Sequence, residues 1–507
     1  IVIGESTEPG TLFPPATGEV VETAIGAQIF LRLADMGDEL NTVGDAGFIP
    51  RLAQSWERVD SLTWLFYLNP AAEWHDGVSV TAHDVEFTFD LYRDSLVASA
   101  TATSIPSVDR VSAVDSHTVR VTFSRSYSEQ FYDATYHVYI LPSHLLEGVP
   151  RSEVRSHPFA RNPVGNGPYR FVSWEAGSSI ELAAVEDHFL DEPDIDRQIW
   201  RFIPSSTPVI NQLLTGEVDF VRTLPRDAIE MAIDEPTITT LTYGTSGYGY
   251  LSFNMRNPND LFQGHPIFSD RAVRSAIATA IDRYEIVEAV LGGYAAVPDG
   301  PATRILGIWR EAPRVAANQA EARRLLAESG WMDADGDGVL DKDDSPLAFE
   351  LLLPSSSTPR RGIGVILQER LRSVGMDVRV IEVENTTFVE YAAAGSFDAM
   401  LGFWRQDPSP ATIRESWTGS DPGSLNYSRY SSPEFDRLVD AAIEETDPES
   451  AREKWWDAFD LINSDAVAIW LYNPTHVAAA TARVSNVRLN PVQWWAHLRE
   501  FRIADGN

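Results

Sequence analysis

Residues 162–175 read N-P-V-G-N-G-P-Y-R-F-V-S-W-E, which is the pattern of a turn followed by a strand. The first half, 162–168, is built from proline, glycine and asparagine, which supply the backbone angles of a tight turn. The positions that follow, 169–174, are mostly aromatic or β-branched and suit a half-buried strand. We call 162–168 the Gly-Asn-Gly turn, and it predicts that the chain enters a sheet at residue 169.

The segments on both sides alternate between strand and helix patterns. Apolar or alternating runs predict strands at 1–4, 63–68, 248–254, 347–353, 378–383, 396–401 and 467–472. Apolar residues at helical spacing predict helices at 22–34, 207–215, 269–283, 363–374 and 451–463. Ser269 is the expected N-cap of one helix, and Thr81 that of another beginning at Ala82, with Asp84 in its first turn. Strands that alternate with helices indicate an α/β protein.

The length and composition of the chain indicate how many domains to expect and argue against several classes of protein. A chain of 507 residues is too long for one hydrophobic core, so two or three domains are expected. The formal net charge of −34 argues against nucleic-acid binding, because phosphate recognition needs clustered Lys and Arg. The absence of cysteine excludes disulfides, thiolate metal sites and cysteine nucleophiles. No run approaches about 18 apolar residues, so the sequence predicts no membrane-spanning helix.

The strongest local motif is the acidic loop 333–344, D-A-D-G-D-G-V-L-D-K-D-D. Calcium takes about six to eight oxygen ligands, and closely spaced carboxylates supply several of them. Gly338 falls at the sharp-turn position, while the last position holds Asp where the EF-hand pattern prefers Glu. The expected ligands of a structural Ca²⁺ are Asp333, Asp335, Asp337, the carbonyl of Val339, Asp341 and Asp344. The alternative is an acidic turn that holds no ion.

Motifs of the common enzyme classes are absent from the sequence. It contains no G-x-S-x-G, H-E-x-x-H or Walker A motif, and the Gly-Asn-Gly turn lacks the third glycine of a dinucleotide loop. His75 and Asp76 are residue types of a catalytic pair, but the Asp-Gly dipeptide there favours a hairpin turn packed by Trp74. The sequence therefore predicts a protein that is not an enzyme, with a secreted, calcium-stabilised hydrolase as a distant alternative.

As a string, 162–169 closely resembles the N-P-[VI]-G-[TN]-G-P-[YF] signature of the extracytoplasmic solute-binding proteins that serve peptide, nickel, opine and oligosaccharide ABC transporters. Further blocks resemble this family in the same order along the chain. They are P-R-L-A-Q-S-W-E at 50–57, L-T-W-L-F-Y-L at 62–68, W-H-D-G-V-S-V-T-A-H-D-V-E-F-T at 74–88, G-E-V-D at 216–219 and D-R-A-V-R-S-A-I-A-T-A-I-D-R at 270–283. The resemblance covers essentially the whole chain.

The resemblance implies a two-lobed periplasmic-binding-protein (Venus-flytrap) α/β fold with a small additional inserted domain. Lobe I is expected at 1–36, 160–252 and 478–507, the inserted domain at 37–159, and lobe II at 253–477. The lobes of such a monomer close on a solute, which is then delivered to the permease subunits of an ABC importer for transmembrane transport. The expected location is periplasmic or extracytoplasmic. Because the chain begins at Ile1, we expect a removed export leader, with lipid anchoring through that leader as an open alternative.

The family also ranks the expected ligands. Peptide comes first because it is the commonest ligand of these proteins. An oligosaccharide is the runner-up, since sugar-binding proteins use tryptophan stacking and the chain has 14 Trp. Nickel and opine rank lower, and the ten His are not clustered in a way that suits nickel.

In peptide-binding members, an Asp of the second lobe pairs with the α-amino group of the ligand. The matching segment here is 402–410, G-F-W-R-Q-D-P-S-P, and the resemblance gives that role to Asp407. The segment is shorter than the common W-x-x-D-x-x-D-P form, so a turn initiated by Asp407-Pro408 is the alternative.

The remaining expected ligand-binding residues are aromatic or basic. Trp404 and Trp417 either stack on a ligand or fill the core. Tyr248 and Tyr250 lie beside the crossover between the lobes of the family and are expected to line the cleft. Arg405 either holds a carboxylate through bidentate hydrogen bonds or lies on the surface.

Overall fold

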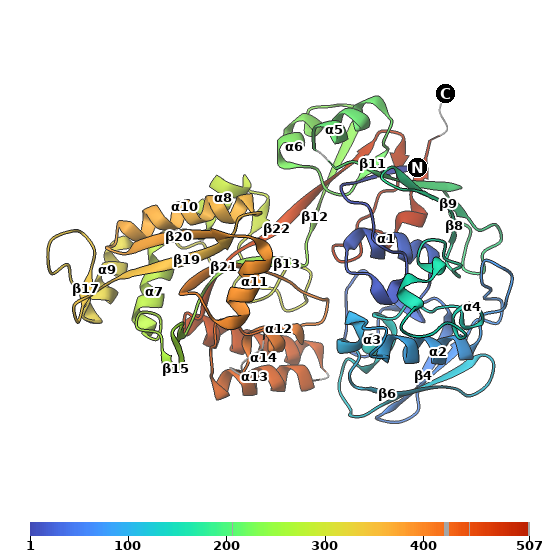
Figure 1. Cartoon of the computed structure of the whole chain (residues 1–507), viewed down its shortest axis with the longest axis horizontal. Coiled ribbons are helices and arrows are strands. Elements are labelled where there is room, and N and C mark those ends of the chain that lie inside the picture. The colour runs from blue at the N-terminus through green and yellow to red at the C-terminus, as the bar shows by residue number, and fades with distance from the viewer. Residues whose placement is uncertain (205, 420–424, 446, 505–507) are drawn as a thin grey trace. The chain divides into compact units, whose positions relative to one another are not determined.

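The computed structural model (Figure 1) describes residues 1–204, 206–419, 425–445 and 447–504. The chain folds into two compact units: unit 1 comprises Ile1–Tyr243 and His476–Asn507, and unit 2 comprises Gly244–Thr475. The chain thus passes between them after Tyr243 and after Thr475, whereas the expected lobe boundaries follow residues 252 and 477. Residues 37–159 lie within unit 1.

One sheet of unit 1 is built around strand β1 (Val2–Glu5). It pairs in parallel with β10 (Arg197–Phe202) and with β11 (Phe220–Val221), and β10 continues antiparallel to β9 (Ser179–Ala184). The sheet ends at β8 (Tyr169–Glu175), which begins where the sequence predicted. Other elements of unit 1 are α1 (Val20–Ile29), α5 (Ser206–Thr215), α6 (Arg226–Ile233), β2 (Ala34–Met36), β3 (Phe48–Pro50), β23 (Val484–Ser485) and β24 (Arg502–Ile503).

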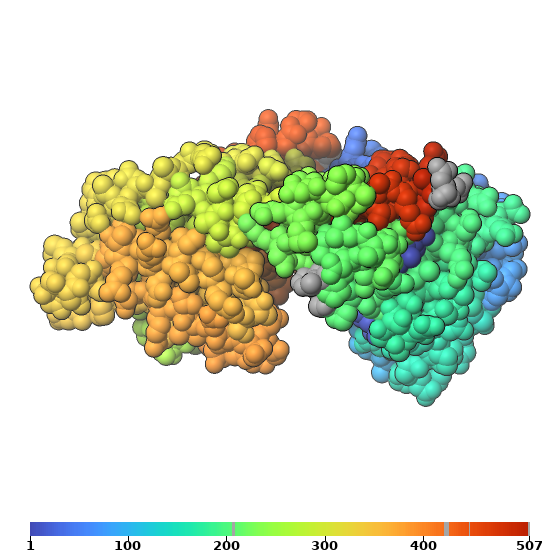
Figure 2. All heavy atoms as spheres, turned by 90° about the horizontal axis from the view of Figure 1, so that it is seen from above, coloured from blue at the N-terminus to red at the C-terminus, as the bar shows by residue number. Residues whose placement is uncertain are grey.

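Helices α5 and α6 lie on the surface of unit 1, as the space-filling view shows in green (Figure 2). Their exposed apolar side chains include Leu214, Met231 and Ile233. The bounds of α5 agree closely with the predicted helix at 207–215.

The second sheet of unit 1 is antiparallel, with strand order β4 (Ala53–Arg58), β5 (Thr63–Leu68), β7 (Thr118–Phe123) and β6 (Val108–Ala113). Its core gathers aromatic rings around Phe131, which lies 4.8 to 5.5 Å from the rings of Phe48, Trp56, Trp64 and Phe66. Helices α2 (Ala82–Arg93), α3 (Gln130–Thr135) and α4 (Ser143–Leu146) belong to the same region.

The predicted N-cap of α2 is confirmed. The backbone N–H of Thr81 donates to Asp84 at 2.8 Å, and the Thr81 side chain and the N3 backbone complete a capping box. Asp84 also accepts from the backbone and the hydroxyl of Ser143, so one carboxylate joins the start of α2 to α4.

Unit 2 is built around a mixed sheet. Its strand order is β20 (Asp377–Val383), β19 (Ala348–Pro354), β21 (Ala399–Arg405), β13 (Gly247–Phe253) and β22 (Ala468–Thr481). The last residues of β22 belong to unit 1. Strand β19 is parallel to β20 and β21, and β13 is antiparallel to β21 and β22. Its longer helices are α7 (Arg271–Ala280), α8 (Arg283–Leu291), α9 (Gln319–Glu328), α10 (Thr358–Arg372), α11 (Asn385–Ala394), α13 (Pro433–Glu444) and α14 (Pro448–Ser464) (Figure 1).

The predicted helix at 269–283 is wrong at both ends. Asp270, not Ser269, is the N-cap, since its carboxylate accepts from the N–H of Ala272. The helix ends at Ala280 because Ile281 is extended, with φ −118° and ψ 142°. Asp282 then caps α8 through the N–H groups of Tyr284 and Glu285. A second cap inside the apolar repeat therefore divides the segment into two helices.

The Gly-Asn-Gly turn is bound to the end of α1. The N–H groups of Asn166 and Gly167 both donate to the carbonyl of Ile29, at 3.0 and 2.8 Å. The side-chain oxygen of the fully buried Asn166 accepts from the N–H of Leu31 at 2.8 Å. A Cβ atom added to Gly165 would lie 1.9 Å from the Ile29 carbonyl oxygen. The glycine is therefore required by close backbone approach.

The predicted hairpin turn at Trp74 is confirmed, and it docks on the Gly-Asn-Gly turn. The N–H of Gly77 donates to Trp74 O at 2.8 Å, and Trp74 is buried. The Nδ1 atom of His75 accepts from the N–H of Gly165, so Nε2 carries the proton and donates to Gly167 O at 2.9 Å. Asp76 pairs instead with His144 at 2.8 Å, so these bonds give the hairpin an anchoring role.

Burial favours the neutral form of the His75 imidazole. Burial is the main cause that lowers its pKa to about 4, against a smaller opposing effect of the Gly167 carbonyl.

Among the described residues, no helix combines the length and the apolar character needed to cross a membrane.

Replacement of Gly165 by Ala is expected to destabilise the protein by about 3 kcal/mol, because the added methyl group would overlap the Ile29 carbonyl. The matched control is Gly26→Ala within α1, where an added Cβ meets nothing within 4 Å. This control should be neutral or stabilising by about 0.5–1 kcal/mol, since alanine favours helix. Urea unfolding of both variants measures the difference, and equal stabilities would contradict the packing argument.

His75 should make stability depend on pH. Its folded pKa of about 4 lies below the ordinary value of 6.5, so the unfolded chain binds the proton more tightly. The contribution is fully present above about pH 6.5 and is lost as the pH falls towards 4, by up to about 3 kcal/mol. Urea unfolding across this range should show a shallower pH dependence for His75→Gln than for the wild type. An unchanged slope would refute the assignment.

Candidate functional site

An aromatic cluster fills the core of unit 2 beside strand β13. Trp417, at the end of α12 (Thr412–Trp417), lies 5.3 Å from the ring of Tyr250 and 4.8 Å from that of Trp470. Its indole N–H donates to the hydroxyl of Tyr248 at 2.9 Å. All four side chains are buried, and burial raises the pKa of both tyrosines. The structure therefore places Tyr248, Tyr250 and Trp417 in the core.

Glycines in the neighbouring strands make room for these rings. Tyr250 lies opposite Gly402 in the β13–β21 register, and a Cβ there would lie 2.3 Å from the tyrosine ring. Gly249 is covered in the same way by the ring of Tyr472, at 2.1 Å. An aromatic ring that lies flat over a glycine of the next strand covers the sheet on that face. The sequence analysis did not use this pattern.

The other predicted ligand-binding residues remain within reach of solvent at the end of β21. Trp404 is half-buried and stacks on Tyr427, with ring centroids 5.4 Å apart and an interplanar angle of 22°. Arg405 and Asp407 are exposed. Between them, the N–H of Gln406 donates to Ser246 O at 2.6 Å, which anchors the segment to the start of β13.

The electrostatic environment of Asp407 is distinctive for an exposed carboxylate. Desolvation by the surrounding protein, followed by the Glu415 carboxylate, raises the pKa of Asp407 above its ordinary value. Since its side chain is solvent-accessible, we expect Asp407 to be ionised at neutral pH. A positively charged group would relieve both effects.

Unit 1 contains a pocket of about 380 Å³ at the carboxyl ends of β1, β10 and β11. The buried Glu5 carboxylate accepts from Nε of Arg222 at 3.0 and 3.1 Å. Burial raises the pKa of Glu5, while Arg222 opposes that shift. On the same wall, the hydroxyl of Thr223 and Nδ1 of His476 are 2.7 Å apart. Ligands of α/β sheets bind at such carboxyl ends, so this is a second candidate binding surface.

The sequence analysis missed this pocket because its polar pairs are separated by 217 and 253 residues. One local signal was available: Glu5 ends the apolar run I-V-I-G and lies at the carboxyl end of the first strand.

The acidic loop brings together three of its five predicted carboxylates. Oxygens of Asp333, Asp335 and Asp341 all lie within 4.8 Å of one another. Asp337 accepts from the N–H of Val339 at 2.8 Å and is not in this group. Asp344, with φ 60°, belongs to the turn between β17 (Asp341–Lys342) and β18 (Ser345–Pro346) and is also outside it. Three hard carboxylate oxygen donors at this spacing fit a calcium ion.

Comparison with known proteins identifies relatives whose sequence similarity extends over nearly the whole chain. Residues 47–424 match the family described as bacterial extracellular solute-binding proteins, family 5 Middle. The oligopeptide-binding protein AppA of Bacillus subtilis is 27% identical, over 98% of this chain and 91% of its own length. The probable D,D-dipeptide-binding periplasmic protein DdpA of Escherichia coli is 25% identical, over 97% and 92%.

Solved structures agree with this result. The structure of AppA from B. subtilis in complex with a nonapeptide is similar with a TM-score of 0.77 and 26% identity, over 100% of this chain and 99% of that chain. The substrate-binding protein CtaP from Listeria monocytogenes has a TM-score of 0.84 at 21% identity, over 99% of both chains, which shows the fold alone. The predicted fold class is confirmed. The chain belongs to the bacterial extracellular solute-binding proteins of family 5.

Proposed function

We propose that this protein captures a peptide outside the cytoplasm and delivers it to the permease of an ABC importer. Its family is one of extracellular solute-binding proteins, and AppA, DdpA and the Salmonella typhimurium protein OppA are named for oligopeptide or dipeptide binding. The likeness to AppA with its bound nonapeptide supports the same class of ligand. The protein acts by stoichiometric binding and not by turnover.

The observation that carries the proposal is the exposed Asp407 carboxylate, which follows the half-buried Trp404 by three residues. The ammonium group of a peptide gains a charge-assisted hydrogen bond from such a carboxylate. Trp404 belongs to the same segment, and its stack with Tyr427 offers apolar surface to a neighbouring side chain of the ligand. Arg405 is exposed two residues away and supplies a guanidinium for a carboxylate.

The anchoring of this segment gives Asp407 a defined position. Gln406 uses its backbone N–H on Ser246 and its side-chain amide on Pro301 O, at 2.7 Å. Gln406 is therefore held through both its backbone and its side chain. Because the neighbouring Asp407 is already positioned, ligand binding costs less conformational entropy than it would in a flexible segment.

An oligosaccharide is the second candidate, and it rests on the same Trp404–Tyr427 pair, since sugars pack on aromatic faces. Trp417 and Trp470 are buried in this structure and offer no such face. For the location, we propose a periplasmic or extracytoplasmic protein, with lipid anchoring through a removed leader as the finer alternative.

Replacement of Asp407 by Asn should weaken binding of a peptide with a free amino terminus by about tenfold or more, about 1.4 kcal/mol, because the ion pair is lost. Native mass spectrometry of the purified protein identifies co-purified peptides, and calorimetry with a synthetic copy measures affinity. Acetylation of that peptide's amino terminus should remove the difference between wild type and variant.

The matched control is Glu415→Gln, which removes the neighbouring exposed carboxylate and leaves Asp407 in place. This variant should bind the peptide with nearly the wild-type affinity. If Asp407→Asn also binds normally, the amino-group assignment is wrong. A co-purified sugar in place of peptides would favour the second candidate.

We also propose that the acidic loop holds a structural Ca²⁺ through Asp333, Asp335 and Asp341. An ion there would offset repulsion among these carboxylates and tie the loop to the hairpin of β17 and β18.

Calcium should raise the thermal unfolding midpoint of the protein relative to an EGTA-treated sample, because the ion binds the folded loop. Asp333→Asn should abolish this shift while it keeps an acceptor for the N–H of Gly336. Asp344→Asn, outside the group of three, should retain the shift and serves as the control. Equal midpoints with calcium and EGTA would contradict the proposal.

A further inference from the structure

A small cavity in unit 1 lies where α1 meets the C-terminal segment. Its volume is about 40 Å³, enough for one or two occupants of about the size of water. It is partly open to solvent, so small solutes can enter. Its polar lining consists of Gln28, Asp35, Arg51, Tyr139, Gln493 and Arg499.

Positive charge outweighs negative charge around this cavity. Asp35 is the single carboxylate of the lining, and it accepts from Nε of Arg51 at 2.6 Å. The buried Arg32 lies behind the wall, 3.9 Å from Asp35 and stacked on the ring of Tyr139. Although burial opposes the effect, Arg51 and then Arg32 hold the pKa of Asp35 below its ordinary value. Three guanidinium groups therefore share one ionised carboxylate.

Hydrogen bonds and ion pairs do not neutralise this excess of positive charge. Within the described residues, the Arg499 side chain has no hydrogen bond or ion pair, although it is more than half-buried. Burial and then Arg51 lower its pKa, against smaller opposing effects of the Asp35, Glu500 and Asp191 carboxylates. The Nε atom of Arg32 is buried without a hydrogen-bond partner in the described structure. The Gln493 amide, oriented with its oxygen towards Arg32, accepts from Nη1 at 2.6 Å but brings no charge.

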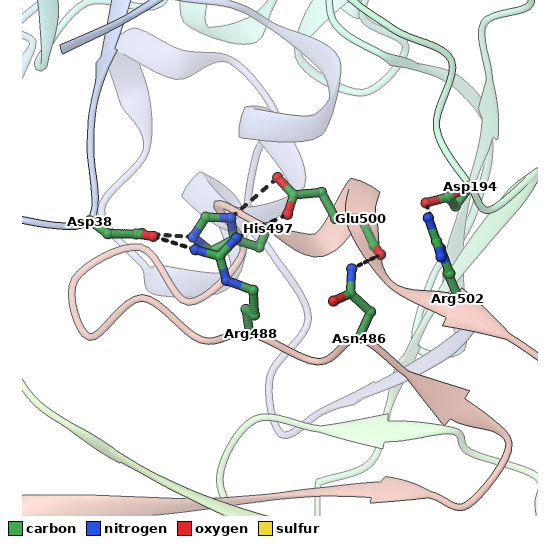
Figure 3. Close-up of polar contacts among 7 residues, drawn as sticks. All are labelled: Asp38, Asp194, Asn486, Arg488, His497, Glu500 and Arg502. Carbon is green, nitrogen blue, oxygen red and sulfur yellow. Dashed lines mark hydrogen bonds and ion pairs between the residues drawn. The ribbon is translucent and has the colours of Figure 1, made fainter. Parts of the chain in front are cut away.

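Three acidic residues nearby, Glu500, Asp38 and Asp194, are already bonded to other side chains (Figure 3). Glu500 lies 3.3 Å from Nδ1 of His497 and accepts from Arg488 at 3.4 Å. Asp38 lies 2.7 Å from Nε2 of His497 and accepts from Arg488 at 2.5 Å. Asp194 pairs with Arg502 at 3.3 Å. These three carboxylates are engaged elsewhere, and the exposed Asp191 acts on Arg499 only through its charge. Among the described residues, Arg499 therefore has no direct hydrogen-bond or ion-pair partner.

We propose that this cavity binds a small monovalent anion of about the size of chloride, between the guanidinium groups of Arg51 and Arg499. An anion there would give Arg499 a partner and offset its repulsion from Arg51. The cavity walls come from α1, from residues 35 and 51 and from the C-terminal segment, so the anion would join three separate parts of unit 1. The site involves no residue assigned to peptide or calcium binding and is independent of both.

Bromide locates the site directly, because it replaces chloride and scatters anomalously. A crystal of the wild-type protein soaked in bromide should show an anomalous peak in the cavity next to Arg499. The peak should be absent in Arg499→Gln and present in Arg502→Gln. The second variant removes an exposed cation of the same segment that is paired with Asp194, outside the cavity. Ordered water in place of bromide in the wild type would overturn the proposal.

In solution, chloride should raise the thermal unfolding midpoint of the wild type in a saturable way at constant ionic strength, with gluconate as the bulky balancing anion. Arg502→Gln should respond like the wild type, and Arg499→Gln should lose the response. At low chloride, Arg499→Gln should be at least as stable as the wild type, because repulsion from Arg51 is gone. A wild-type response in Arg499→Gln, or none in the wild type, would refute the anion site.

Discussion

The carbonyl oxygen of Ile29 is the point on which the organisation of unit 1 depends. It lies at the end of α1, where helix carbonyls lack partners within the helix. Two consecutive N–H groups, from Asn166 and Gly167, supply those partners, and the Asn166 side chain adds a third bond to Leu31. A buried carbonyl must be satisfied, so the Gly-Asn-Gly turn and the helix end determine each other's position.

Other parts of unit 1 are attached through the same turn. His75 bonds to Gly165 and Gly167, which brings the hairpin of the antiparallel region to the turn. Directly after the turn, Tyr169 begins β8 and its hydroxyl donates to Ile195 O at 3.0 Å. Pro168 lies in the wall of the arginine-lined cavity together with residues of α1 and of the C-terminal segment. Helix, hairpin, sheet and C-terminus therefore meet around one short glycine-containing loop.

Unit 2 buries large aromatic side chains against its sheet and exposes charged side chains at the end of strand β21. Rings of Tyr250 and Tyr472 lie over Gly402 and Gly249, and the indole N–H of Trp417 donates to the Tyr248 hydroxyl inside the core. The chain then leaves β21 with Arg405 and Asp407 exposed. An apolar layer beneath solvent-exposed charges suits a protein that binds and releases a solute.

The sequence by itself determined the features that depend on neighbours within a few residues. The Gly-Asn-Gly turn, the Asp-Gly hairpin, the Thr81 N-cap and the α/β alternation were predicted correctly, because local backbone preferences decide them. The family was also recognisable from its motifs. Two predicted helices were wrong in their bounds. Within 269–283, Asp282 acts as a second cap inside a continuous apolar pattern, and the helix predicted at 22–34 ends at Ile29 because Phe30 is extended.

Tertiary structure alone decided which side chains meet. Aromatic residues such as Tyr248, Tyr250 and Trp417 are expected both at a ligand-binding surface and in a core. Their burial and the packing of rings over glycines of adjacent strands show that they lie in the core. The Glu5–Arg222 pair joins residues 217 positions apart, and three of five loop carboxylates converge. Such arrangements depend on how strands and loops are brought together in space, and no short stretch of sequence carries that information.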